Sequence, residues 1–278
     1  MGSPSPKLER LLVVSGRYHI QRKLGSGSMG SVYLARDEAT SSLVALKVVK
    51  TDRLGPEGLA DLQREFRDIA DLRHPQIAAA YDFGYTTEAR IPFYTREYIA
   101  GTPLRPGPPG QEGQLSPRDF LQPFYDLLDA LHYLHAQEIL HLDIHAGNVI
   151  EADDDERGSV LIDFGLVGAL RGSGTSALLQ SGFSLPPELL GEETVGPAAD
   201  LYSLGQLLLF RLTGSAEGEA RLSREIPGWG SRLTLELERI ISKAIQPDPM
   251  QRFRSARAFR EALAAALGGP GGSGGMPI

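Results

Sequence analysis

The sequence predicts an α+β fold in which a small antiparallel β-sheet with one helix precedes a larger, mainly α-helical part. Apolar and polar residues alternate from Tyr18 onward, which is the period-2 pattern of strands with one buried face. Residues 58–72 and 117–135 instead carry apolar side chains at helical spacing. A chain of 278 residues is long enough to bury a sizeable core, as one large domain or as two lobes.

The composition excludes several classes of function. A net charge of −7 without a basic face argues against a nucleic-acid partner. The absence of cysteine excludes disulfides, thiolate metal sites and a cysteine nucleophile. No apolar run approaches the roughly 18–20 residues that span a bilayer, and residues 1–10 lack the apolar core of a signal peptide. We therefore expect a cytoplasmic chain without a membrane-spanning segment.

A glycine-rich segment lies early in the strand-rich part. Gly25, Gly27 and Gly30 have the spacing GxGxxG, which lets a backbone turn tightly and bring its N–H groups close to phosphates. This spacing is weak evidence by itself, because many turns contain several glycines. In a dinucleotide-binding fold such glycines open a helix. Here the β-type residues 32–34 follow, so we expect a hairpin between two strands.

Three oxygen-bearing side chains occupy two neighbouring segments of the helical part. Asp143 and Asn148 lie five residues apart, and Asp163 follows Asn148 by fifteen residues at the end of an apolar run. Phosphoryl transfer needs a carboxylate to orient the attacking hydroxyl and oxygen ligands to hold Mg²⁺ on the phosphates. Each residue alone would be an ordinary solvated side chain, but together their types and spacing fit these tasks.

These segments resemble those of the protein-kinase superfamily. Residues 141–148 are similar to the catalytic loop, and residues 161–165 to the Asp-Phe-Gly segment. The resemblance, in particular to bacterial-like Ser/Thr protein kinases, continues in order over about residues 18–267. It implies a bilobal kinase fold, with a small antiparallel sheet and one helix in the first lobe and a larger, mainly helical second lobe.

The resemblance also predicts how the chain is divided. A glycine-rich tail, residues 268–278, has the composition of a flexible linker that would lead to further domains. We predict four segments: a flexible start at 1–16, the first lobe at 17–99, the second lobe at 100–267 and the linker at 268–278.

The resemblance assigns the nucleotide contacts. Lys47 would contact the phosphates and pair with Glu65. By themselves, Lys47 would fit an edge-strand lysine that points to water, and Glu65 a solvated helix position. The backbone of Glu97 and Ile99 would read the adenine edge. Apolar side chains would enclose the base, together with the glycine segment above the phosphates: Leu24, Val32, Ala45 and Ile150, with Gly25, Gly27 and Gly30.

The resemblance further implies ATP and Mg²⁺ as cofactors and a protein as substrate. Asp143 would accept the hydrogen of the substrate hydroxyl, and Asn148 and Asp163 would hold Mg²⁺. His145 would face the transferred phosphate, and the Ser181 hydroxyl would bond the catalytic aspartate. Four residues have predicted supporting roles: His141 in packing, Asp200 in bonding the catalytic-loop backbone, and Glu188 with Arg252 in a salt bridge.

Three residues depart from the family pattern. Arg96 stands at the gatekeeper position, where an apolar or small residue is usual. Because a buried unpaired guanidinium is costly, we expect Arg96 to pair with Glu65 or Asp163, or to turn outward through a shifted register. Leu142 replaces an arginine that pairs with an activation-loop phosphate, so we expect activity without phosphorylation of that loop.

The third departure leaves alternatives open. His145 stands where Ser/Thr kinases typically carry lysine, and the resulting H-x-D-x-H-x-x-N string also occurs in aminoglycoside and choline-type phosphotransferases. Ser181 and the activation segment through Glu188 favour a Ser/Thr protein kinase. The alternatives are a small-molecule hydroxyl phosphotransferase and a non-catalytic nucleotide-binding module. The retained Lys47 and acidic residues favour an enzyme over the last of these.

Overall fold

The computed structural model describes residues 13–27, 30–50, 56–106, 115–163, 185–191, 195–214 and 229–268. The described residues form two compact units. The first unit contains those up to Arg73 together with Ala78–Ile99, and the second contains His74–Ile77 and those from Ala100 onward.

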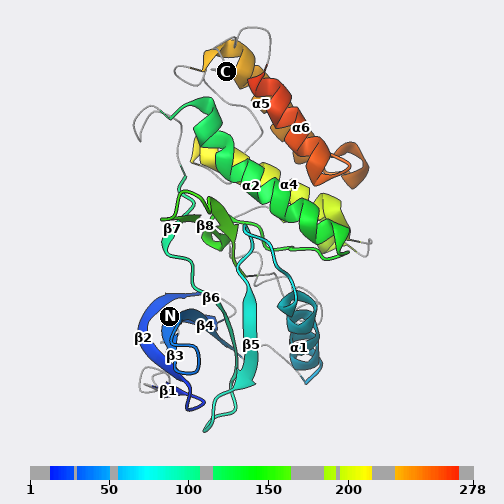
Figure 1. Cartoon of the computed structure of the whole chain (residues 1–278). Coiled ribbons are helices and arrows are strands. Elements are labelled where there is room, and N and C mark those ends of the chain that lie inside the picture. Colours follow the sequence, from blue (N-terminus) through cyan, green and yellow to red (C-terminus); the bar gives the residue numbers. More distant parts are fainter. Residues whose placement is uncertain are drawn as a thin grey trace. The chain divides into compact units, whose positions relative to one another are not determined.

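The first unit is built on a six-stranded antiparallel sheet with the order β1-β2-β3-β4-β6-β5 (Figure 1). Its strands are β1 (Val13–Val14), β2 (Tyr18–Ser26), β3 (Gly30–Asp37), β4 (Leu43–Val49), β5 (Ala80–Tyr85) and β6 (Pro92–Glu97). The glycine-rich segment joins β2 to β3, and the Gly27 N–H donates to the Gly30 carbonyl at 2.8 Å. The prediction of a hairpin at this point is therefore confirmed.

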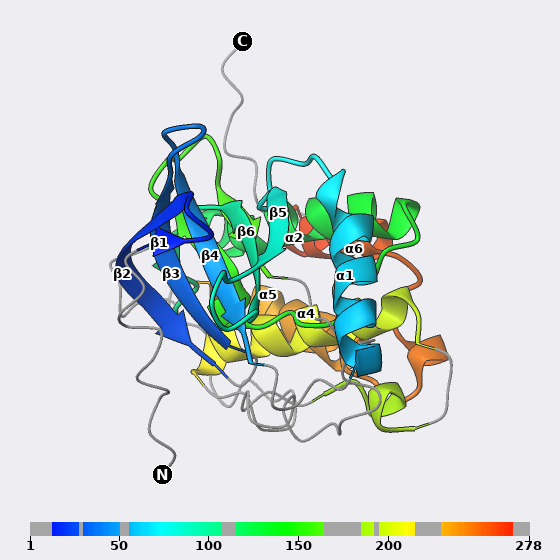
Figure 2. The ribbon, with the colours of Figure 1, turned by 90° about the horizontal axis from the view of Figure 1, so that it is seen from below.

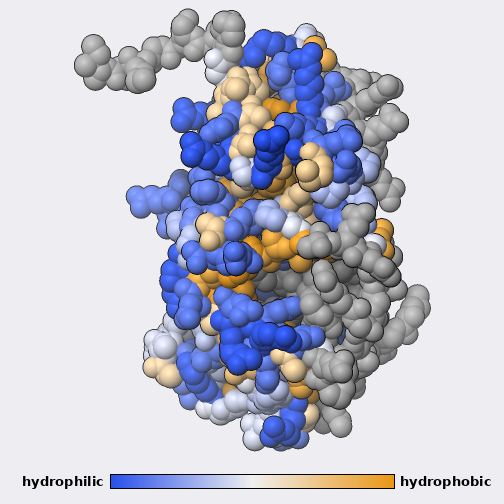
Figure 3. All heavy atoms as spheres, turned by 90° about the vertical axis from the view of Figure 1, so that its right-hand side faces the viewer, coloured by the Kyte–Doolittle hydropathy of each residue, from blue (hydrophilic) through white to orange (hydrophobic). Residues whose placement is uncertain are grey.

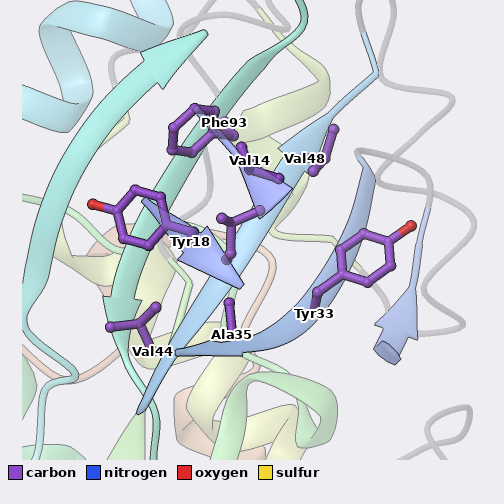
Figure 4. Close-up of a cluster of buried hydrophobic side chains, with 8 residues drawn as sticks. Val14, Tyr18, Tyr33, Ala35, Val44, Val48 and Phe93 are labelled. Atoms are coloured by element: carbon purple, nitrogen blue, oxygen red, sulfur yellow. The ribbon is translucent and has the colours of Figure 1, made fainter. Parts of the chain in front are cut away.

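The two faces of β4 carry different side chains, because successive residues of a strand point to opposite sides. Val44, Leu46 and Val48 belong to a buried cluster with Tyr18 and Phe93 (Figure 4). Ala45, Lys47 and Val49 consequently stand on the other face of the sheet. The hydrophobic cluster thus closes one face and leaves the second to other partners.

The single helix of the first unit covers part of that second face. Helix α1 (Pro56–Ala70) lies beside β5 (Figure 2). Leu62 and Phe66 of α1 pack with Val49 of β4, Ala80 of β5 and Tyr94 of β6. Burial of these apolar side chains holds the helix on the face that also carries Lys47.

The second unit is mainly helical (Figure 1). Its helices are α2 (Pro117–Ala136), α4 (Pro197–Thr213), α5 (Gly230–Ala244) and α6 (Ala256–Leu267). Short 3₁₀ helices and a three-stranded sheet complete the described part: η1 (Ala146–Asn148), η3 (Pro187–Leu190), η4 (Pro249–Gln251), β7 (Gly101–Pro103), β8 (Val149–Ala152) and β9 (Ser159–Leu161). Helix α2 packs against α4, α6 and β9, and α4 packs against α5.

Helix α2 shows why the local sequence forms this element. The Ser116 hydroxyl caps its first turn by accepting from the Asp119 N–H at 3.2 Å, and Pro117 occupies a position where a missing N–H costs nothing. One face is fully buried by large apolar side chains: Leu121, Phe124, Leu127, Leu128, Leu131 and Leu134. The predicted amphipathic helix is confirmed and ends one residue later, at Ala136.

Polar side chains predominate on the coloured part of the face drawn in Figure 3. Few large apolar side chains are exposed among the described residues: Leu43, Tyr81, Leu115, Leu190, Leu235 and Met250. Within the described ranges, no helix combines the length and apolar character that crossing a membrane requires.

Candidate active site

The three glycines of the first unit differ in what they accommodate. A Cβ atom at Gly30 would lie 2.1 Å from the Val48 carbonyl oxygen of the neighbouring strand, so the pairing of β3 with β4 requires glycine there. A Cβ atom at Gly25 or Gly27 would meet no heavy atom within 4 Å. Packing therefore explains Gly30, whereas the other two glycines leave open space along the loop.

Lys47 lies in the interior of the first unit. It belongs to a central strand, opposite Val32 of β3 and Tyr94 of β6, and only 8% of it is exposed. Its Nζ atom lies 5.6 Å from the centre of the Tyr94 ring. The alternative of an edge-strand lysine that points to water is therefore wrong.

Glu65 lies on the half-buried side of α1, between the core residues Leu62 and Phe66. The Phe66 ring contacts the same Tyr94 ring that faces Lys47, with centroids 6.0 Å apart. The helix turn that carries Glu65 and the strand that carries Lys47 thus pack around one aromatic side chain. This arrangement brings the two predicted partners to one region of the first unit.

The Arg96 side chain does not point outward, which was one of the two predicted alternatives. It is 7% exposed, and the register of β6 against β4 continues without a shift from Val44 opposite Glu97 to Val48 opposite Phe93. Its Nη1 atom donates to the Glu97 carbonyl at 3.1 Å. The outward orientation and the shifted register are therefore wrong, because the guanidinium finds an acceptor inside the unit. Its pairing with Glu65 or Asp163 stays a prediction.

In the second unit, a buried carboxylate organises the predicted catalytic loop. Asp200, in the first turn of α4, is fully buried. Its Oδ1 accepts from the Leu142 N–H at 2.7 Å, and its Oδ2 accepts from the His141 N–H at 3.0 Å and from His135 Nε2 at 2.8 Å. The predicted role of Asp200 is confirmed, whereas the contribution of His135 was not predicted.

The backbone at Leu142 is strained. Its φ of 58° lies in the left-handed region, which costs a residue with a Cβ atom roughly 1–2 kcal/mol. The bond from its N–H to Asp200 holds the loop in this conformation. His141, which precedes it, is fully buried, and its Nδ1 accepts from the Asp143 N–H at 3.3 Å. Its predicted packing role is therefore confirmed.

The structure brings Asp143, Asn148 and His145 together. Asn148 Nδ2 donates to the Asp143 carbonyl at 3.0 Å and to its Oδ2 at 2.8 Å. His145 Nδ1 accepts from the Gly147 N–H at 3.0 Å, so the proton of the neutral imidazole lies on Nε2, which is 3.5 Å from Asp143 Oδ1. Asn148 therefore holds one carboxylate oxygen of Asp143, and the His145 imidazole lies near the other.

The two predicted metal ligands lie at one end of the β8–β9 hairpin. The Ile162 N–H, adjacent to Asp163, donates to the Asn148 carbonyl at 2.9 Å. Because Asn148 Nδ2 is bound to Asp143, its amide oxygen is the atom left to ligate a cation. Asp163 has a φ of 55°, a conformation that aspartate tolerates better than most residues.

This donor set fits Mg²⁺, which takes a few protein oxygens and completes its octahedron with phosphate and water. Within the described part of the chain, no group of three or more histidine, cysteine, aspartate or glutamate residues could hold a metal ion by itself. The pair of Asn148 and Asp163 therefore suits a metal ion that arrives with a phosphate ligand.

The remaining predicted residues are only partly described. Ile150 lies in β8, and Ile99 is buried at the end of the first unit. Ser181 lies outside the described residues. The predicted salt bridge between Glu188 and Arg252 is confirmed, with the two side chains buried and bonded at 2.6 and 2.8 Å.

A second, partly buried ion pair was missed by sequence reasoning. Arg211 of α4 bonds both carboxylate oxygens of Glu151 in β8, at 3.0 and 3.2 Å, and donates to the Arg105 carbonyl. Its guanidinium lies 5.2 Å from the centre of the Phe120 ring of α2. These partners are 60 or more positions from Arg211, so no local spacing in the sequence signals them.

The chain belongs to the protein kinase family, because residues 18–263 match the family described as Protein kinase domain. The two units accordingly have the bilobal kinase fold, with an antiparallel sheet and a helix in one lobe and mainly helices in the other. Membership implies the use of ATP, a divalent metal ion and protein substrates.

More specifically, the chain is a homologue of bacterial Ser/Thr protein kinases. It is 32% identical over 270 residues to serine/threonine-protein kinase PknB of Mycolicibacterium smegmatis, which covers 90% of this chain and 43% of that protein. It is 31% identical over 260 residues to PrkC of Bacillus subtilis, which covers 87% of this chain and 39% of that protein. The chain thus spans less than half the length of these relatives.

A solved structure supports the same fold. A crystal structure of a mutant kinase domain of Mycobacterium tuberculosis PknI superimposes on this chain with a TM-score of 0.71 at 25% identity. The match covers 96% of this chain and 100% of the PknI chain.

Proposed function

We propose that this chain transfers the γ-phosphoryl group of ATP to Ser or Thr hydroxyls of protein substrates, with Mg²⁺. One observation carries the proposal. Asn148 bonds the Asp143 carboxylate at 2.8 Å and is joined by its carbonyl to the residue before Asp163. One loop and one hairpin end of the second unit thus supply a carboxylate that could receive a proton and two oxygens that could ligate a metal ion.

In the proposed reaction, the substrate hydroxyl oxygen forms a bond to the γ-phosphorus while the bond to the ADP oxygen breaks. Asp143 orients that hydroxyl and accepts its proton as the new phosphate ester forms. The donor Asn148 Nδ2 holds one of its carboxylate oxygens in position, and His145 Nε2 lies 3.5 Å from the other. Mg²⁺, when bound at Asn148 and Asp163, neutralises charge that develops on the phosphates.

His145 would act as a hydrogen-bond donor near the transferred phosphate. Its Nδ1 is occupied by the Gly147 N–H, so the hydrogen on Nε2 is the one directed toward Asp143. A neutral imidazole supplies less charge than the lysine usual at this position, and we infer that His145 contributes mainly to positioning.

The first unit supplies the features expected of a nucleotide-binding lobe. Lys47 is buried on the sheet face opposite the hydrophobic cluster, next to Ala45 and Val32. The open space beside Gly25 and Gly27 leaves room for phosphates next to this loop. We infer that these residues bind ATP together with Leu24 and the backbone of Glu97 and Ile99.

We further infer that activity does not require phosphorylation of the activation segment. Leu142 carries no charge that could bind a phosphate, and its backbone is held instead by Asp200. The catalytic loop therefore has a support that is independent of phosphorylation. Ser181 is proposed to bond Asp143 in the assembled site.

The experiment that tests the function uses labelled ATP with Mg²⁺ and the full chain. Casein and an aminoglycoside such as kanamycin serve as separate acceptors, and acid hydrolysis identifies the phosphorylated amino acid. We expect phosphoserine or phosphothreonine on the protein, and a loss of about 10²-fold or more in D143N and K47M. The exposed turn residue Asp155 provides the matched control D155N. Phosphate on the aminoglycoside alone would overturn the proposal.

A further inference from the structure

Arg96 is placed to influence which purine the first unit accepts. Its Nη1 atom donates to the carbonyl oxygen of Glu97 at 3.1 Å, and only 7% of the residue is exposed. In the proposed function, that carbonyl is one of the two backbone groups that read the edge of the base. A charged side chain of the protein itself therefore bonds an acceptor that the nucleotide would use.

The sheet register places the guanidinium on the face proposed for the nucleotide. Arg96 is directly opposite Ala45 in the β4–β6 ladder, and directly opposed residues project to the same face. Lys47 is two residues further along β4 and shares this face. The other face is filled by the hydrophobic cluster that includes Val44, Leu46 and Phe93.

The chemistry of this bond opposes recognition of an exocyclic amino group. A 6-amino purine donates hydrogen, and it would have to share or displace the guanidinium at the Glu97 carbonyl. A bond from a charged donor is stronger than one from a neutral amine. Displacing the guanidinium would also leave a buried charge without one of its acceptors, which is costly.

We propose that Arg96 is a specificity-determining residue, which takes the Glu97 carbonyl from the purine so that binding does not depend on the 6-amino group. The ligand class is then purine nucleoside triphosphates, including those without an amino group at carbon 6. The proposal rests on the proposed function, because it assumes that this unit binds the nucleotide.

The test measures the dissociation constants of ATP and purine riboside triphosphate by calorimetry, with Mg²⁺ and the full chain. Purine riboside triphosphate lacks the 6-amino group but keeps the N1 acceptor of adenine. For the unmodified protein, we expect the two constants to agree within about twofold. In R96M the carbonyl becomes available to the amino group, so ATP should bind about two- to twelvefold more tightly than the analogue.

The exposed Arg36 of β3 provides the matched control, since R36M removes the same charge from the same sheet. R36M should retain the ratio of the unmodified protein. A ratio of tenfold or more in favour of ATP in the unmodified protein would overturn the proposal, and this comparison does not depend on the folding of a variant. An unchanged ratio in R96M with an intact thermal transition would overturn it as well. If neither triphosphate binds, the proposed function itself fails.

Discussion

Asp200 accepts the N–H of Leu142 at 2.7 Å, and this bond holds a leucine in a left-handed backbone conformation. The two residues are 58 positions apart in the chain. The carboxylate receives two further donors, from His141 and His135, and is fully buried. The shape of the catalytic loop therefore depends on a side chain of the central helix α4.

We accordingly expect D200N to destabilise the fold by about 2–3 kcal/mol, because hydrogen bonds to a buried charge are worth more than those to an amide. The amide nitrogen of the new asparagine is itself a donor, so it could not accept from the His141 or Leu142 N–H. Urea unfolding followed by circular dichroism measures the change, with D155N in an exposed turn as the control. If D200N and the control changed the free energy of unfolding by the same amount, this role of Asp200 would be contradicted.

The buried pair of Arg252 and Glu188 should behave differently from an exposed pair. R252M leaves the Glu188 carboxylate buried without its partner, so we expect a loss of about 3–5 kcal/mol. The pair of Arg257 and Glu261 lies on the exposed side of α6, so R257M should cost about 0.5 kcal/mol or less. Equal unfolding midpoints for the two variants in urea would refute the distinction.

Substitutions at the three glycines near β3 should have different effects. Gly30 should matter for stability, and Gly25 and Gly27 for nucleotide binding. G30A would drive a Cβ atom against the Val48 carbonyl, and we expect a loss of about 1–3 kcal/mol in stability. G25A meets no neighbouring atom, so its stability should change by about 0.5 kcal/mol or less. G25A should instead raise the KM for ATP. A larger loss of stability in G25A than in G30A would contradict this description of the loop.

His141 predicts a pH dependence of stability. Burial lowers the pKa of its imidazole below the ordinary value of 6.5, although the nearby Asp200 carboxylate partly offsets this effect. The unfolded chain therefore binds more protons than the folded chain below about pH 6.5. Stability should be fully present above that pH and fall as the pH decreases, by at most about 1.4 kcal/mol per pH unit for this group.

The variant H141N keeps an acceptor near the Asp143 N–H but removes the titrating group. We expect its free energy of unfolding to fall less steeply between pH 7.5 and 5.5 than that of the unmodified protein. His74, whose pKa is also lowered by burial, contributes equally to both proteins and cancels in the comparison. Identical slopes would exclude His141 as a source of the pH dependence.

Leu142 predicts insensitivity to activation-segment phosphorylation. Phosphatase treatment of the purified chain should leave the initial rate of phosphoryl transfer within about twofold, because Leu142 has no charge that binds phosphate. L142R should respond to the same treatment with a loss of rate. A loss of tenfold or more in the unmodified protein would show that another cation has this role.

Local sequence patterns predicted the elements that local physics controls. Alternating apolar residues indicated the strands of the first unit, and Ser116 with Pro117 indicated the start of α2. The five-residue spacing of Asp143 and Asn148 was enough to place their side chains in contact, because both belong to one short loop. The glycine hairpin followed from the β-type residues after Gly30.

Contacts between distant segments were beyond such reasoning. For Arg96, the alternative of an outward orientation was wrong, because the unshifted register of β6 against β4 buries this side chain. His135 was missed as a donor to Asp200, and Arg211 was missed as the partner of Glu151. The residues of each of these last two pairs lie 60 or more positions apart in the chain.

The amino-acid sequence by itself determined the class of fold and the residues that we propose for phosphoryl transfer, because periodicity and short spacings are encoded within single elements. Only the tertiary structure decided which donors hold Asp200, and on which face of the sheet Arg96 is buried. Those choices depend on the packing of α4 beneath the catalytic loop and on the pairing of β4 with β6. Packing and strand pairing join residues that have no fixed separation along the chain.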